Sequence, residues 1–171
     1  MTDISDVSQK IGFATFATDD SVIFFAEKIG DLWQVNAFDR KTLTQSRILK
    51  GYRLLLPWKQ QFIVADVKGQ FYLLDQHYQL VNQLQLQIDF NLRHQVSLHG
   101  NKLIAANIGV DSNWRLATLN LISGQYHQQV TNTLPIKTQF SFNKDGSAAV
   151  VVTGNDHENQ LVKIGYNFGY D

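Results

Sequence analysis

The stretch from Phe142 to Gly165 limits the possible folds more than any other part of the sequence. An Asp145-Gly146 pair separates Phe142 from the apolar run at 148–152, and a polar loop separates that run from a second strand-like segment at 159–165. Asp-Gly between apolar runs is a strong hairpin signal, because the turn needs residues that accept positive φ. The stretch therefore predicts three antiparallel strands joined by tight connections.

Weaker copies of this unit occur upstream. The pattern apolar-x-x-apolar followed by Asn, Asp or Gly begins at four places, Leu32, Phe71, Leu116 and Leu161. These starts lie 39, 45 and 45 residues apart. In a second register, residues 16–22 align without gaps on residues 142–148. A regular period of this length indicates a repeat protein.

Four short strands in every 40–50 residues fit one propeller blade. The sequence therefore predicts an all-β fold of about four β-propeller blades, the fourth without its outer strand. Residues 11–171 are predicted to form a single domain, and residues 1–10 a tail or a closing strand. Three arrangements stay open: a piece of a larger propeller, a closed four-bladed ring in which residues 2–8 supply the missing strand, and one ring built from two copies. A sandwich or another all-β fold is the remaining alternative.

Two segments show the strand pattern most plainly. At 83–90, four apolar residues alternate with polar ones, which predicts a strand with one buried face and one wet face. At 22–26 every residue is apolar, which is typical of a strand buried on both faces.

Three segments carry a resemblance to a known family. Residues 142–152, Phe-Asn-Lys-Asp-Gly-Ser-Ala-Ala-Val-Val-Val, resemble the Ser-Pro-Asp-Gly turn and apolar strand of TolB-like and WD40-like bacterial propeller repeats. Residues 32–36 and 116–124 resemble the Leu-Trp-x-Val-Asn strand and turn of the same repeats. The resemblance implies a β-propeller fold. Such propellers also resemble the sensor halves of membrane-anchored regulators of the CadC kind, which implies a sensory role.

The charge balance and the apolar runs exclude several partners. Lys and Arg number 15 and Asp and Glu number 15, so no global field attracts nucleic acid or anionic lipid. The longest apolar runs, such as 148–152, are far shorter than the ~20 residues of a membrane span. The acidic first residues predict a cytoplasmic chain as written, or a periplasmic one if it is a fragment of an exported or membrane-anchored protein.

The sequence offers no pattern for catalysis or metal binding. Cysteine is absent, which excludes disulfides, thiol catalysis and thiolate metal sites. The five histidines have no metal-ligand spacing, and no phosphate loop or nucleophile motif occurs. We therefore expect no cofactor, no metal and no enzymatic activity.

Four cations stand near the starts of the predicted innermost strands: Lys10, Arg53, Arg93 and Lys137. If those strands surround one channel, the cations ring one of its mouths and bind an anionic ligand or an acidic partner loop. The alternative is ordinary solvation of exposed strand ends.

Further candidates lie in a polar loop and on the tryptophans. Asp156 and His157, beside Glu158, are expected on the same face as the cations and suit a hard cation, whereas the alternative is a wet loop tip. The three tryptophans offer stacking surfaces for a sugar or base, although packing between blades is favoured for Trp33.

The predicted function is a non-enzymatic recognition or sensory module within a larger protein or assembly. It binds a protein partner or a small anionic ligand. Two alternatives remain: a propeller enzyme, a hydrolase or lyase with a site at the channel mouth, and a structural dimerisation domain that self-associates.

Overall fold

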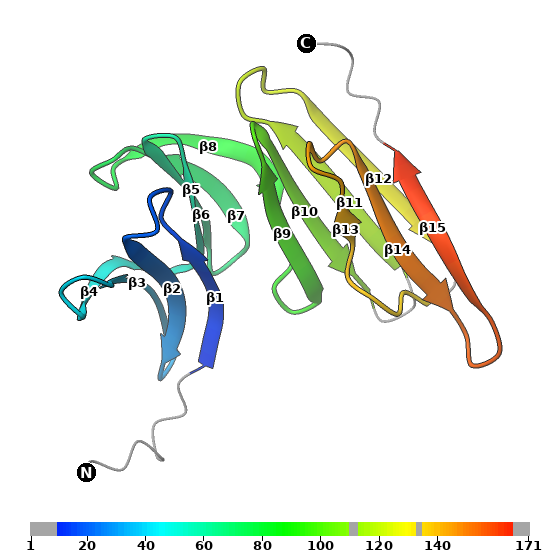
Figure 1. The fold of residues 1–171 in the computed structure, drawn as a ribbon, viewed down its shortest axis with the longest axis horizontal. Coiled ribbons are helices and arrows are strands. Elements are labelled where there is room, and N and C mark those ends of the chain that lie inside the picture. Colours follow the sequence, from blue (N-terminus) through cyan, green and yellow to red (C-terminus); the bar gives the residue numbers. More distant parts are fainter. Residues whose placement is uncertain (1–9, 110–112, 133–134, 166–171) are drawn as a thin grey trace. The chain divides into compact units, whose positions relative to one another are not determined.

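The structure is a computed structural model that describes residues 10–109, 113–132 and 135–165, and all the regular elements in these ranges are β-strands. The strands form four antiparallel sheets, three with four strands and one with three (Figure 1). The predicted all-β fold of about four blades is confirmed; in the described residues the fourth sheet has three strands. Within the described residues no helix is long and apolar enough to cross a membrane.

The chain divides into two compact units, residues 1–84 and 85–171. Unit 1 holds blades 1 and 2, and unit 2 holds blades 3 and 4; β8 runs across the boundary. The prediction of one domain over residues 11–171 stays a prediction, and so do the three ring arrangements. The proposed closing strand at residues 2–8 lies outside the described residues.

Unit 1 contains two four-stranded meanders. Blade 1 consists of β1 (Lys10–Phe16), β2 (Val22–Ile29), β3 (Leu32–Asp39) and β4 (Thr44–Lys50). Blade 2 consists of β5 (Tyr52–Trp58), β6 (Gln61–Asp66), β7 (Gln70–Leu74) and β8 (Leu80–Gln87). In each blade consecutive strands are neighbours, so short turns suffice to connect them.

One apolar cluster joins the two blades of unit 1. Phe24, Trp33 and Val35 of blade 1 are buried against Leu55 and Val64 of blade 2. Full burial of an aliphatic or aromatic side chain of this size stabilises by about 1.5–3 kcal/mol. Trp33 therefore packs between blades, as predicted.

Unit 2 contains one complete blade and one shorter one. Blade 3 consists of β9 (Arg93–His99), β10 (Lys102–Ile108), β11 (Asn113–Asn120) and β12 (Tyr126–Asn132). Blade 4 consists of β13 (Ser141–Phe142), β14 (Ala148–Gly154) and β15 (Asn159–Gly165). A second apolar cluster, including Trp114, Leu116, Phe140 and Val151, joins these blades.

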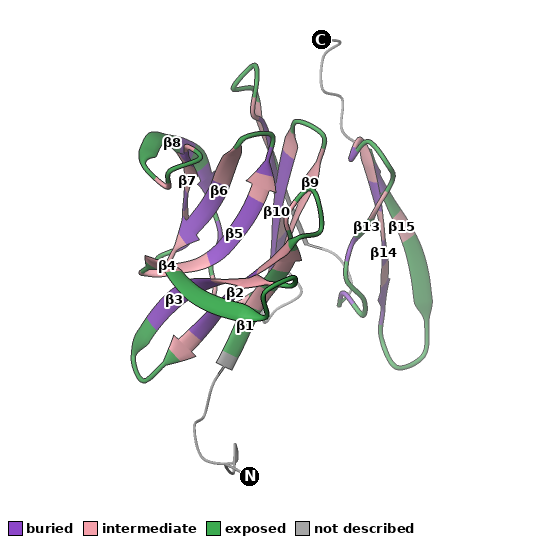
Figure 2. Ribbon diagram, turned by 60° about the vertical axis from the view of Figure 1, so that its left-hand side comes forward, coloured by how far each residue is buried: buried purple, intermediate pink, exposed green. Residues whose placement is uncertain are grey.

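Blade 4 ends in an open edge. Most of β15 is exposed (Figure 2), and Leu161 has a relative exposure of 72%. No strand of the described residues pairs with its outer side. The N–H and C=O groups along that side are available to another strand.

The gap-free alignment of 16–22 on 142–148 is confirmed by the turns that these residues form. In both turns an aspartate, Asp19 or Asp145, accepts hydrogen bonds from the N–H and the hydroxyl of the serine two residues later. The next residue has positive φ in both: 58° at Asp20 and 66° at Gly146. Glycine is required at position 146 for a second reason, because a Cβ there would lie 2.9 Å from the Cβ of His99.

The first copy of the repeated strand pattern begins at Val35, three residues later than the match at Leu32. The turn after the third strand is closed by a side chain whose Oδ1 accepts two backbone N–H groups, and in blades 1 to 3 that side chain belongs to Asp39, Asp75 and Asn120. Asn36 instead lies buried within β3 and donates to Glu27. The pattern is also matched by Val35, Phe38 and Asp39, so two matches overlap in the sequence. The hydrogen bonds that Asp39 accepts in the turn identify the later match as the true copy.

Candidate functional site

The site begins where the chain enters blade 3. Asn107 of β10 holds the backbone of Asp89: its Oδ1 accepts the Asp89 N–H, and its Nδ2 donates to the Asp89 carbonyl, both at 2.8 Å. These bonds occupy the backbone that would otherwise extend β8, which ends at Gln87 although the alternation continues to Phe90. They also fix the path of the chain into β9, whose first residue is Arg93.

The innermost strand of blade 4 is interrupted. Ile136 forms an isolated bridge with Thr153, and the Lys137 N–H donates to the Val152 carbonyl at 2.9 Å. Regular pairing resumes only at Ser141, opposite Val150. Residues 138–140 therefore stand opposite the single residue 151, so the strand bulges by two extra residues.

Two side chains of β9 bind the backbone of this bulge. The Gln95 amide donates to the Phe140 carbonyl at 2.7 Å and accepts the Phe140 N–H at 2.9 Å. The Arg93 guanidinium donates to the Ile136 carbonyl at 3.2 Å and to the Thr138 carbonyl. Side chains of blade 3 thus replace strand bonds that the bulge removes from blade 4.

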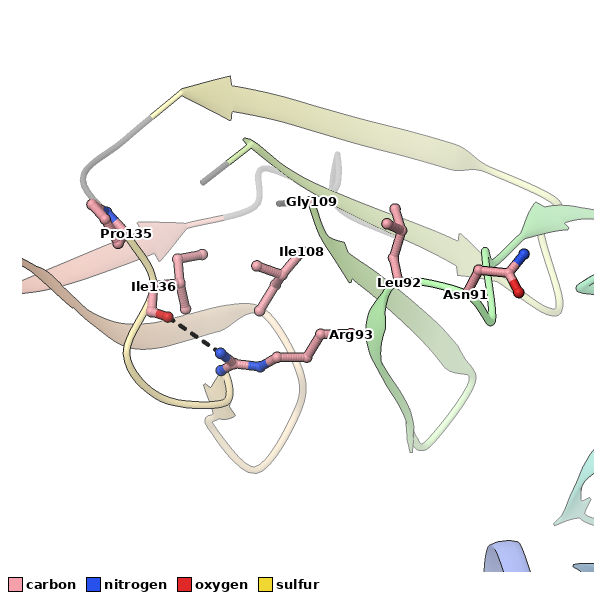
Figure 3. A pocket seen from close by; sticks show the side chains of 7 residues that line it. All are labelled: Asn91, Leu92, Arg93, Ile108, Gly109, Pro135 and Ile136. Atoms are coloured by element: carbon pink, nitrogen blue, oxygen red, sulfur yellow. Dashed lines mark hydrogen bonds between the residues drawn. The ribbon is translucent and has the colours of Figure 1, made fainter. Parts of the chain in front are cut away.

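A cavity of about 320 Å³ opens beside these contacts (Figure 3). Its lining residues are Asn91, Leu92, Arg93, Ile108, Gly109, Pro135 and Ile136. Four of them are aliphatic, and Arg93 supplies the only formal charge among the lining side chains. Arginine has five N–H groups, and the two bonds to carbonyls leave three for a ligand. The cavity suits a small anion that carries an apolar group.

The four predicted cations are distributed over both units. Arg93 lines the cavity, whereas consecutive positions in a paired stretch put the Lys137 side chain on the face opposite Ile136. Lys137 lies in the short paired stretch of the innermost strand that precedes the bulge.

Lys10 and Arg53 belong to unit 1. Lys10 is the first residue of β1, and the Arg53 guanidinium lies 4.3 Å from the ring centroid of Trp33. Burial lowers the pKa of Arg53. Because the units are described separately, the prediction that the four cations share one mouth stays a prediction.

Asp156 and His157 lie exposed at the tip of the β14–β15 loop. Asn155 organises the loop by accepting the N–H groups of His157 and Glu158 at 2.9 Å each. No group of three His, Cys, Asp or Glu residues that could hold a metal ion occurs in the described ranges, so the hard-cation reading of this loop gains no support.

Sequence reasoning missed Gln95 and Asn107. The signal for Asn107 was present: one amide inside the apolar run at 103–108 is buried and needs a partner. Gln95 gave no such signal, because polar residues are common at strand ends.

No family model and no curated protein matches the sequence. Solved structures do match. TolB from Acinetobacter baumannii aligns with a TM-score of 0.63 and 19% identity, over 96% of this chain and 42% of that one. The β-propeller domain of the Trilobed protease from Pyrococcus furiosus aligns with a TM-score of 0.56 and 13% identity, over 92% of this chain and 56% of that one. An acylaminoacyl peptidase aligns with a TM-score of 0.55 and 12% identity, over 91% of this chain and 31% of that one.

These similarities show the fold alone. The chain has the β-propeller fold, similar to TolB, and spans about half or less of the length of these structures. The link to sensors of the CadC kind stays a prediction.

Proposed function

We propose that the chain is a non-enzymatic recognition module of a larger assembly, and that its Arg93 cavity binds an anionic group of a protein partner or small ligand. One observation carries this proposal: a guanidinium with three unused N–H groups stands in a cavity with aliphatic walls. The same propeller fold serves TolB and also several enzymes, so the fold itself does not select the function.

The physical argument is local. The chain has no net charge, so it exerts no long-range attraction on an anion. Arg93 is exposed, and the aliphatic residues beside it lower the dielectric locally, which strengthens its interaction with an anion that contacts them. We expect affinity to fall as salt rises, since screening shortens to about 8 Å at physiological ionic strength.

The test is a titration of the ¹⁵N-labelled chain with acetate and with an acidic hexapeptide, followed by NMR. We expect shifts at the N–H groups of Asn91, Leu92 and Ile136 that weaken with added NaCl. Arg93→Gln should remove them, whereas Lys163→Gln, an equal charge change on exposed β15, should leave them. If the Arg93 variant does not fold, the position and salt dependence of the wild-type shifts decide. Shifts scattered over exposed lysines would refute the proposal.

Enzymatic activity is the competing function. The name of one similar structure describes a peptidase, and that activity is a property of that protein. Turnover of aminoacyl, ester or lactone substrates by the purified chain, abolished by a substitution in the cavity, would replace our proposal with that alternative.

Self-association is a second candidate, favoured by the open outer edge of β15 and its exposed Leu161. A second copy that pairs along this edge would satisfy its free backbone groups. Sedimentation should then show a concentration-dependent dimer that Leu161→Lys disrupts. The matched control is Leu80→Lys, which changes an exposed leucine of unit 1. A wild-type chain that stays monomeric at high concentration excludes this candidate.

A further inference from the structure

We propose that the Arg93 cavity recognises the free α-carboxylate of a polypeptide that ends in an aliphatic residue. This inference rests on the proposed function and names the chemical class of its ligand. The carboxylate would bind the guanidinium, and the terminal side chain would contact the aliphatic walls.

The guanidinium is held ready for a planar anion. Its two bonds to the carbonyls of Ile136 and Thr138 fix its plane before any ligand binds. The remaining N–H groups match a carboxylate, which arginine binds through two parallel bonds. Within the described ranges no carboxylate lies in ion-pair distance of Arg93, so its charge is not already neutralised by the protein.

The aliphatic residues that line the cavity favour an apolar group next to the carboxylate of the ligand. Leu92, Ile108, Pro135 and Ile136 place aliphatic surface beside the guanidinium of Arg93, which is itself exposed. At about 320 Å³ the cavity lies at the lower end of the range for ligand pockets, about 300–1,000 Å³, which suits one terminal residue. An Asp or Glu side chain inside a peptide would bring flanking polar backbone groups against these walls, where they lose their hydration.

The charge count argues against phosphate. A single guanidinium carries one positive charge, equal and opposite to one α-carboxylate. A phosphate monoester carries about −1.5 to −2 at pH 7, so a single guanidinium leaves part of its charge uncompensated. An α-carboxylate with an aliphatic side chain matches both the charge and the walls.

A buried tryptophan packs with two of the residues that line the cavity. Trp114 is 4% exposed, and its indole N–H has no acceptor among the described residues. It belongs to the apolar cluster that contains Ile136 and packs against Ile108, two residues that line the cavity. Because Trp114 packs with residues that line the cavity, its indole NMR resonance reports on ligand binding there.

The experiment compares three hexapeptides of otherwise identical sequence. The first ends in Val-Leu with a free carboxylate, the second is its C-terminal amide, and the third is an amide with one internal Asp. We expect the free acid to bind at least ten-fold more tightly than either amide and to shift the Trp114 indole resonance. Arg93→Gln should abolish the difference between acid and amide, and Lys163→Gln should preserve it.

Each other outcome has a distinct meaning. If the Asp peptide binds the cavity as tightly as the free acid, the inference is wrong and the proposed function stands. Equal binding of the first peptide and its amide excludes carboxylate recognition by Arg93. If none of the peptides binds and acetate also causes no shift, both proposals fail. Should Arg93→Gln not fold, the acid-to-amide ratio on the wild-type chain still decides.

Discussion

The two units join their blades at the same place by different means. In unit 1, Trp33 of β3 contacts Arg53, an extra residue in the register of β5 with β6. In unit 2, Trp114 of β11 contacts Phe140 in the three-residue bulge before β13, with ring centroids 5.7 Å apart. Each tryptophan is the second residue of its strand, and each meets a bulged residue of the next innermost strand.

The difference between the two joints follows from the size of the bulge. One extra residue in β5 leaves the ladder to β6 nearly intact, and the Arg53 guanidinium covers the face of Trp33. In blade 4 three residues stand opposite one, so backbone groups lose their strand partners and Gln95 and Arg93 supply new ones. A larger irregularity in one blade therefore requires polar side chains from its neighbour.

The largest expected loss of stability comes from substituting Phe140, the bulged residue of unit 2. Phe140 is 2% exposed, so Phe140→Ala should lower the free energy of unfolding by about 3–5 kcal/mol through lost burial and a cavity. Urea unfolding followed by circular dichroism measures this. A loss below about 1 kcal/mol would show that the bulge repacks and that the Trp114 contact is unimportant.

The second effect tests the hydrogen bonds across unit 2. Gln95→Ala removes two bonds and leaves the N–H and C=O of Phe140 unpaired, which should cost about 2–3 kcal/mol. Gln139→Ala is the matched control, because Gln139 lies exposed in the same bulge. Equal effects of the two substitutions would mean that water replaces Gln95 without loss.

A smaller effect is expected at the matching joint of unit 1. Arg53→Ala should cost about 0.5–1 kcal/mol, the usual contribution of a partly exposed cation over an aromatic ring. Arg53→Lys, which retains the charge but loses the flat stacking group, should fall between wild type and alanine in urea unfolding. A cost at Arg53 that equals the cost at Phe140 would remove the distinction between the two joints.

The smallest effect concerns the turns that the two units share. The Ser147 hydroxyl and then its N–H lower the pKa of Asp145, with a smaller contribution from Lys102, and Ser21 acts in the same way on Asp19. Since both pKa values are lowered by folding, this stabilisation is present above the unfolded pKa and is lost as pH falls through the folded pKa.

Ser147→Ala should therefore raise the pKa of Asp145 toward its ordinary value, and Ser21→Ala should do the same for Asp19. Carboxyl NMR titrations measure both shifts. Added salt should raise the pKa of Asp145 more than that of Asp19, because only Asp145 is lowered by a nearby lysine. Equal salt effects would contradict this difference.

Local chemistry explains what could be predicted from the sequence. The Asp145-Gly146 turn, its relative at Asp19 and the alternation around Leu84 and Leu86 depend on neighbours in the chain, so they were predictable. The register of the first repeat failed because Asn36 and Asp39 fit one pattern and only the turn distinguishes them.

The site was predictable only in part. A cation at the start of β9 was expected, and Arg93 does line a cavity. Its carbonyl partners lie more than 40 positions away in a bulge that has no local sequence signal. A charge at an exposed strand start, as the sequence suggests for Arg93, usually contributes little to stability. The bonds of Arg93 to two carbonyls instead predict some destabilisation on its removal.

The open edge of β15 has a mechanical consequence. Among the described strands β15 pairs only with β14, so a force applied at its last residue breaks the hydrogen bonds between them one at a time. A strand between two neighbours must break two ladders at once. Tension applied at Gly165 would therefore separate β15 from β14 before it reaches the contacts between blades 3 and 4.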